Sequence, residues 1–229
     1  MNKTVPYRLL NQEDPQPPLP SLVLEAIRTA IREGVLKSGQ RLRERDVGDW
    51  LGVSRTPVRE AFRMLQAQGV LSDAPGDGVV VTTLAAPEVH ELYRTWADLE
   101  ATSARDAALY ARPADVLRLQ EVHARWDEGA APQELGTLNR HFHDAICAAA
   151  HNRYLARALD SIDDFLALLG INTYTIPGRA AEVRREHQAI VDAIVNREPQ
   201  KAYGAAHNHI VTAGKLRMAL MLDQPQNLT

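Results

Sequence analysis

The stretch LGVSRTPVRE, residues 51–60, constrains the fold more strongly than any other part of this 229-residue chain. Gly52 suits the left-handed backbone position that follows many helices. Pro57 suits the first turn of a helix, where the N–H group that proline lacks would have no partner. Between them, Ser54 or Thr56 provides a hydroxyl that can cap a helix. The stretch therefore predicts two helices joined by a tight turn.

Apolar residues recur at helical spacing on both sides of this turn. We predict one helix that begins at Ser21, a second over about residues 43–51, and a third directly after the turn. In the third helix an apolar stripe faces inward, while Arg55, Arg59 and Arg63 repeat every four residues on another face. Downstream, GVLSDA, PGDG and VVVTTL predict a strand, a glycine turn and a second strand. Together these segments predict a helix-turn-helix with a β-hairpin wing.

The exposed amino-terminal end of the third helix carries Arg55 and Arg59. Free backbone N–H groups and the helix dipole favour anions there, and the guanidinium fork can bond guanine edges or hold a phosphate. Residues 1–83 contain 11 Lys+Arg against 10 Asp+Glu, net +1, whereas the remainder contains 15 against 19, net −4. The first part of the chain is therefore the expected partner of DNA. The alternative is a small helical subdomain whose arginines are only solvated.

The second part of the chain shows no strand-like alternation of any length. Its apolar residues recur at helical spacing in six segments, which are separated by prolines, a glycine or a His-Asn pair. We therefore predict a mainly α protein that ends in an antiparallel helical bundle. Its expected parts are a flexible arm over 1–20, a winged-helix domain over 21–83, a six-helix domain over 84–222 and a tail over 223–229.

Composition excludes several classes of protein. No stretch approaches the roughly 18 to 20 uninterrupted apolar residues of a membrane helix. The first residues also lack the apolar run of a secretion signal, so we expect a cytoplasmic protein. Cys147 is the only cysteine, which excludes an internal disulfide and a cysteine-based zinc site.

Three histidines fall on the apolar faces of three different predicted helices. They are His143, His187 and His209, and Asn139 lies one turn before the first of them. Three inward imidazoles and an amide oxygen could converge on a divalent metal ion, since imidazole binds zinc, nickel, copper or iron. Hydrogen-bonded core histidines are the alternative.

An open metal site could also activate water, as in a metal-dependent hydrolase. We do not expect an enzyme, because no separate acid–base residue can be assigned and hydrolysis would leave residues 41–83 unexplained. A regulator whose metal is structural, or is itself the signal, is a further alternative.

The run RLRERDVGDWLGVSRTPVREAFRMLQAQGVL, followed by a glycine-bearing hairpin, resembles the winged-helix domain of GntR-type bacterial transcription regulators. The resemblance covers about 60 residues and implies a homodimeric regulator, expected to be a repressor, that binds a palindromic operator in double-stranded DNA. Family members usually carry basic residues in the wing, whereas Asp77 stands at the tip here and should weaken wing contacts. The resemblance places operator contacts on Arg45, Ser54, Arg55, Thr56, Arg59 and Gly78.

Three further segments, LNRHFHDAICAAAHN, REHQAIVDAI and AAHNHI, resemble the FCD helical ligand-binding domain of the FadR-type branch. The resemblance implies a divalent metal, zinc or nickel, held by Asn139, His143, His187 and His209, with open positions for a small carboxylate effector. Aspartate is commonest where Asn139 stands, so metal affinity should be lower here. An arginine usually occupies the position of Trp96, which is expected to be either a pocket wall or plain core. Six helices favour the VanR-like subgroup.

Overall fold

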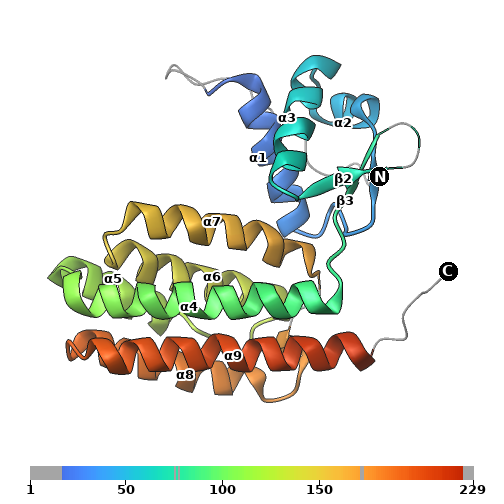
Figure 1. Ribbon diagram of the computed structural model, residues 1–229. Helices are drawn as coiled ribbons and strands as arrows, with labels where there is room; N and C mark the ends of the chain where they lie inside the picture. The colour runs from blue at the N-terminus through green and yellow to red at the C-terminus, as the bar shows by residue number, and fades with distance from the viewer. Residues whose placement is uncertain (1–16, 75, 77, 171–172, 224–229) are drawn as a thin grey trace. The chain divides into compact units, whose positions relative to one another are not determined.

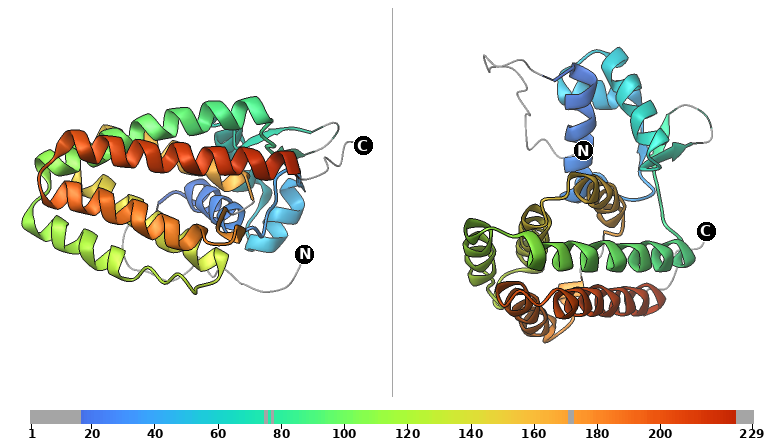
Figure 2. Two further views of the ribbon diagram at one scale, coloured as in Figure 1. Left: turned by 90° about the horizontal axis from the view of Figure 1, so that it is seen from below. Right: turned by 60° about the vertical axis from the view of Figure 1, so that its left-hand side comes forward.

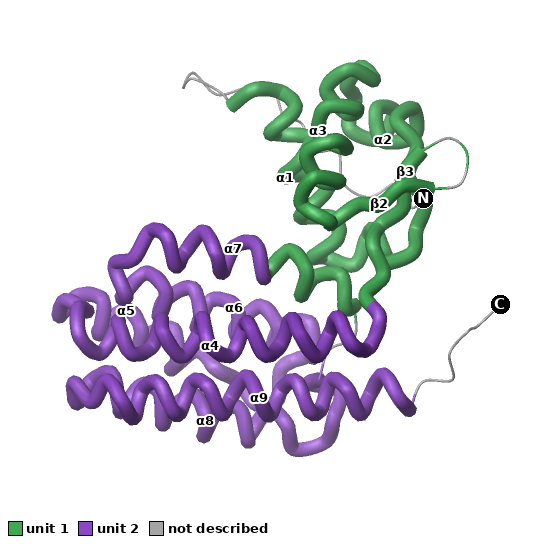
Figure 3. The backbone as a smooth tube through the Cα atoms, viewed as in Figure 1, with its two compact units in different colours: residues 1–84, 163–170 green, residues 85–162, 171–229 purple. Residues whose placement is uncertain are grey.

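The computed structural model describes residues 17–74, 76, 78–170 and 173–223, and its described part is mainly helical with one small sheet (Figure 1). The chain divides into two compact units (Figure 3). Unit 1 comprises residues up to Leu84 together with 163–170, and unit 2 comprises 85–162 and the residues from 171 onward. The mainly α fold class is confirmed. Most of the expected arm, most of the tail and Asp77 lie outside the described residues.

Unit 1 contains the predicted helix-turn-helix and wing. Its sheet has the order β1-β3-β2, and both pairs are antiparallel. The short strand β1 was not predicted, because two residues are too few to show an alternation. The first helix begins two residues earlier than the predicted Ser21, since Pro20 is tolerated in a first turn. The elements are α1 (Leu19–Arg32), β1 (Arg41–Leu42), α2 (Glu44–Leu51), α3 (Arg55–Ala67), β2 (Leu71–Asp73) and β3 (Val79–Val81).

Two glycines give the winged helix its sharp turns. Gly52 ends α2 with a φ of 70°, the left-handed conformation expected there. Gly78 has a φ of 104°, and a Cβ atom at this position would collide with the carbonyl oxygen of Leu42 on the neighbouring strand. Ser54 occupies the N-cap position of α3, but neither it nor Thr56 makes a side-chain capping bond among the described residues. Ser54 is therefore at the expected position, but the expected capping hydrogen bond is wrong.

The end of α7 (Arg153–Leu168) belongs to unit 1. Leu168 is buried in the same apolar cluster as the helices and strands of the winged helix. Asp164 is 5% exposed, and its carboxylate pairs with Arg28 at 2.8 Å and Arg32 at 3.1 Å. The winged-helix core is thus completed by a segment that lies eighty residues further along the chain.

Unit 2 contains five of the six predicted helices, most of the sixth, α7, and a short 3-10 turn. Helices α4 and α9 lie side by side over most of their length (Figure 2). They run antiparallel, because Gly214 of α9 lies against Tyr93 while Tyr203 bonds Asp98 further along α4. No described helix is long and apolar enough to cross a membrane. Besides α7, the elements are α4 (Ala86–Tyr110), α5 (Pro113–Ala124), α6 (Pro132–Ala149), η1 (Thr173–Thr175), α8 (Arg179–Val195) and α9 (Pro199–Asp223).

Helical spacing predicts an apolar stripe on α4 that includes Val89, Leu92, Trp96 and Leu99, and one on α9 that includes Ala202, Ala206 and Leu216. Val89, Trp96, Ala202 and Ala206 are buried as expected. The three leucines are only half-buried, whereas their neighbours Tyr93, Glu100 and Arg217 are buried. The charged side chains of Glu100 and Arg217 therefore enter the interior of unit 2.

Candidate metal centre and DNA-recognition helix

The structure brings the three candidate histidines together inside unit 2. His143 comes from α6, His187 from α8 and His209 from α9, and all three are buried. One ring nitrogen from each lies within 4.8 Å of the others. Helical spacing placed each histidine on an inward face, and the packing of the three helices then makes the faces converge.

Two glutamates lie beside the Nδ1 atoms of two of these imidazoles. The Glu100 carboxylate lies 3.0 Å from Nδ1 of His143, and the Glu186 carboxylate lies 2.6 Å from Nδ1 of His209. A neutral imidazole that donates from Nδ1 to a carboxylate keeps a lone pair on Nε2. The two Nε2 atoms are 3.3 Å apart. If both rings carry their proton on Nδ1, two lone pairs face each other at this distance and need a positive centre between them or beside them; if one ring carries it on Nε2, that ring donates to the other.

The separation of these two nitrogens suits one metal ion. Zinc–nitrogen bonds of about 2.0–2.1 Å in a tetrahedral site place two ligand nitrogens roughly 3.3 Å apart. Among the described residues, Asn139 Oδ1 and both ring nitrogens of His187 are buried without a hydrogen-bond partner. A buried polar atom without a partner is costly. A metal ion at the cluster would satisfy one ring nitrogen of His187, and the Asn139 oxygen is a candidate for a further ligand. The residues present therefore fit a divalent cation.

The two glutamates are themselves held by donors that sequence reasoning missed. Trp96 donates from Nε1 to Glu100 at 3.0 Å. Arg179, which is 1% exposed, donates both arms of its guanidinium to Glu186 at 2.7 and 2.9 Å. Trp96 is 7% exposed and its ring centre lies 5.8 Å from that of His143. The tryptophan is therefore part of the core and of the site at once.

The electrostatics favour neutral His187 and His209 beside an ionised Glu186. Burial holds the pKa of His187 well below its usual value and also lowers the pKa of His209. Burial alone would raise the pKa of Glu186, but hydrogen bonds from His209 and Arg179 lower it overall. Neutral imidazole is the form that binds a metal.

The candidate DNA-binding residues of unit 1 are exposed around the start of α3. Ser54, Arg55 and Thr56 are exposed at its amino-terminal end. Arg59 donates two hydrogen bonds to Glu44 of α2 at 2.7 and 2.9 Å, and this contact lowers the pKa of the glutamate. Arg45 lies 3.7 Å from Asp49 across one turn of α2, with both side chains exposed.

Comparison with known proteins gives two family matches. Residues 21–81 match the model of bacterial regulatory proteins of the gntR family, and residues 91–212 match the FCD domain. The chain belongs to the GntR family and carries an FCD domain. It is 30% identical to the uncharacterized regulator YdhC of Bacillus subtilis over 80% of this chain and 85% of that protein. It is also 30% identical to the Glc operon transcriptional activator of Escherichia coli K12, over 89% of this chain and 90% of that protein.

A solved structure shares the fold of this GntR-family chain. The structure of E. coli McbR/YncC covers 90% of this chain and is itself covered completely, with a TM-score of 0.77 at 21% identity. The family and the matched relatives are DNA-binding transcription regulators, not enzymes.

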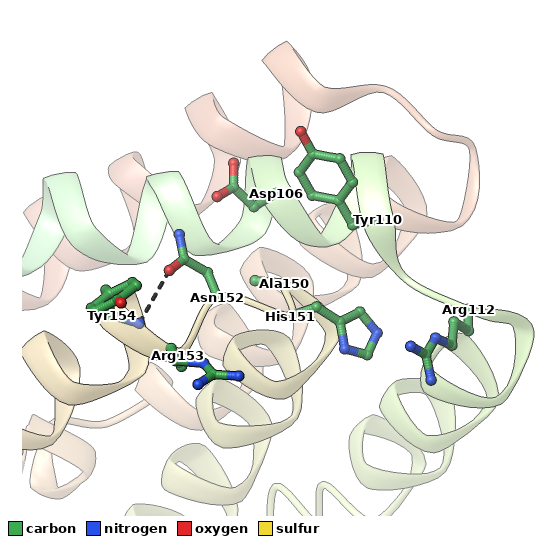
Figure 4. A pocket seen from close by; sticks show the side chains of 8 residues that line it. All are labelled: Asp106, Tyr110, Arg112, Ala150, His151, Asn152, Arg153 and Tyr154. Carbon is green, nitrogen blue, oxygen red and sulfur yellow. Dashed lines mark hydrogen bonds between the residues drawn. The ribbon is translucent and has the colours of Figure 1, made fainter.

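The FCD-domain unit of this regulator also has a surface hollow of about 550 Å³ between the end of α4 and the start of α7 (Figure 4). Two of its polar side chains already have partners: His151 pairs with Asp115 at 2.7 Å, and Asn152 caps α7. Tyr110 and Tyr154 on its rim are mostly exposed. The histidine cluster, with its unpartnered buried donors, is therefore the stronger candidate site.

Proposed function

We propose that this protein is a cytoplasmic, homodimeric repressor that binds a palindromic operator, and that its helical domain holds a divalent metal and a small carboxylate effector. The observation that carries the proposal is the pair of Nε2 atoms 3.3 Å apart, each backed by a carboxylate on the opposite nitrogen of its ring. Repression, rather than activation, is the proposed direction of regulation, because a protein bound at the operator can exclude RNA polymerase. The six-helix domain supports assignment to the VanR-like subgroup.

Asn139, His143, His187 and His209 are the proposed metal ligands. His143 and His209 would bind through Nε2, since their Nδ1 atoms face Glu100 and Glu186. Zinc or nickel suits this donor set. When bound, the metal supplies a Lewis-acidic position for an effector oxygen. Asn139 contributes a neutral oxygen where a carboxylate would bind more strongly.

Operator recognition is assigned to the exposed start of α3 and its surroundings. Arg55 and Arg59 are proposed to bond base edges or phosphates, and Ser54 and Thr56 to bond the backbone. The contact with Glu44 holds the Arg59 fork in place before DNA arrives. Arg45 and Gly78 complete the proposed interface, because Arg45 is exposed on α2 and Gly78 lies in the wing.

The effector regulates by differential binding. A ligand shifts operator affinity only when it binds one arrangement of the paired winged helices better than another. Ligation of the metal by an effector carboxylate changes contacts at α4, α6, α8 and α9 together, since the site takes a side chain from each.

The first test is elemental analysis of the purified full-length protein. We expect about one metal per chain, and its loss in His187→Ala with the circular dichroism spectrum unchanged. His207→Ala is the matched control, because His207 lies on the same helix as His209 but is partly exposed. Well-folded wild type that takes up neither zinc nor nickel would overturn the metal site.

A further inference from the structure

Arg217 is a buried charge without a described partner. It lies on α9, is 8% exposed, and its Nε and Nη1 atoms have no hydrogen-bond partner among the described residues. Burying a charge is expensive unless it is paired and hydrogen-bonded. Arg179, in the same unit, is paired in this way, since its guanidinium donates two hydrogen bonds to the Glu186 carboxylate. Arg217 therefore points to an anion that does not belong to the described chain.

The position of Arg217 relates it to the histidine site. His209 and Arg217 lie on the same buried face of α9, eight residues apart, which is about 12 Å along the helix axis. Side chains on a helix lean toward its amino terminus. The guanidinium is thus directed back toward the level of His209, not away from it.

Two aromatic rings connect the two positions. Gly214 of α9, three residues before Arg217, lies so close to Tyr93 that a Cβ atom there would be 3.0 Å from its ring. The ring centres of Tyr93 and Trp96 are 5.5 Å apart, and those of Trp96 and His143 are 5.8 Å apart. Tyr93 and Trp96 therefore form a continuous wall on α4 from the Gly214 level to the histidines.

We propose that Arg217 is a second anchor for the effector, and that the effector is dianionic: one carboxylate lies at the histidine-held metal, and the other pairs with Arg217. This inference rests on the proposed function. A planar guanidinium binds a carboxylate through two parallel hydrogen bonds, and such a pair gains strength when water is excluded. The hydrocarbon part of the ligand would lie along Tyr93 and Trp96.

The choice of a dianion follows from the number of cationic centres. One carboxylate satisfies an open metal position and leaves the buried guanidinium unpaired. A site built to pair a charged group rejects ligands that lack it, because its own buried group is then left without a partner. The protein should therefore discriminate strongly between dicarboxylates and monocarboxylates of equal length.

The test is isothermal titration of full-length, zinc-loaded protein with linear probes. The dicarboxylates run from malonate to adipate, and the monocarboxylates run from propionate to hexanoate. We expect at least one dicarboxylate to bind at least about tenfold more tightly than the monocarboxylate of equal length. Arg217→Met should remove this ratio while leaving metal content and monocarboxylate affinity unchanged. Arg217→Lys should restore part of it.

Lys215→Met is the matched control, because Lys215 lies on the same helix but is exposed. If wild type and Arg217→Met prefer dicarboxylates over monocarboxylates by the same ratio, the proposed role of Arg217 is overturned. Equal binding of both probe series by wild type overturns it as well. Repeating the titrations after chelation separates the two proposals: discrimination that depends on Arg217 without any metal uptake would retain the anchor and reject the metal.

Discussion

At the scale of single residues, two glutamates decide which nitrogen of each imidazole faces the centre of the site. Glu186 is hydrogen-bonded to Nδ1 of His209, and Glu100 lies 3.0 Å from Nδ1 of His143 without the geometry of a hydrogen bond. Both carboxylates therefore face Nδ1, which leaves Nε2 as the proposed ligand atom. This arrangement also raises the basicity of the ring and fixes its rotation. The histidines alone would leave both choices open.

Glu100→Gln should therefore weaken metal binding without removing a ligand. The amide is close in size to the carboxylate, but it no longer places a negative charge behind the His143 ring. Loss of such an outer partner costs about 10- to 100-fold in metal affinity, measurable by competition with a chromogenic chelator. Glu91→Gln is the control, since Glu91 is exposed on the same helix. Equal loss in both variants would contradict the assigned role.

Asn139→Asp should act in the opposite direction. The Asn139 oxygen is buried and has no hydrogen-bond partner among the described residues, so a carboxylate there would add a full negative charge beside the metal. We expect metal affinity to rise by roughly tenfold or more. The metal-free variant should melt at a lower temperature than wild type, because it buries an unpaired carboxylate. Unchanged affinity in the same chelator assay would mean that residue 139 is no ligand.

At the scale of helices, the exposed amino-terminal end of α3 carries the arginines that are proposed to contact DNA. Arg55→Ala and Arg59→Ala should each lower operator affinity roughly tenfold or more, because a lost bidentate base contact or phosphate contact is not replaced. Fluorescence anisotropy at two salt concentrations distinguishes the two contact types, since loss of a phosphate contact also reduces the salt dependence. Arg94→Ala, exposed on α4, should bind DNA as wild type does.

The end of α7 supplies a testable part of the winged-helix core. Leu168 is 3% exposed within that cluster, so Leu168→Ala should destabilise unit 1 by about 2–5 kcal/mol. Hydrogen exchange at amides of α1 and α3 measures this locally, which matters because a chain of two units need not unfold in one step. Leu117→Ala, with 62% of its side chain exposed, should have little effect. Equal protection in both variants would count against this packing.

Helical periodicity predicted the number of helices and the placement of the histidines, because a stripe of apolar residues fixes which face turns inward. It did not predict that Glu100 and Arg217 are buried. A charged residue next to a leucine normally faces water, and here Glu100 and Arg217 are buried while the leucine beside each is only half-buried. The end of α7 was also missed, since a contact across more than eighty residues leaves no local pattern.

At the scale of the whole molecule, positive charge is concentrated in the winged helix, whereas the rest of the chain is acidic. The chain carries a net charge of −3, yet six arginines fall between Arg41 and Arg63. Operator binding should therefore depend on a local group of cations and weaken steeply as salt screens it. The acidic remainder of the chain discourages binding of DNA elsewhere on the molecule.

The proposed metal binding and operator binding should be coupled. If metal occupancy changes operator affinity by some factor, operator binding must change metal affinity by the same factor, because the two equilibria are linked. We expect a factor within about 5- to 150-fold, the usual range for coupled sites. Operator titrations with zinc or with chelator measure one side, and chelator competition with or without a duplex selected from a random pool measures the other. His187→Ala should show neither effect. Operator affinity that is identical with zinc and with chelator in wild type would make the metal a structural element rather than part of the switch.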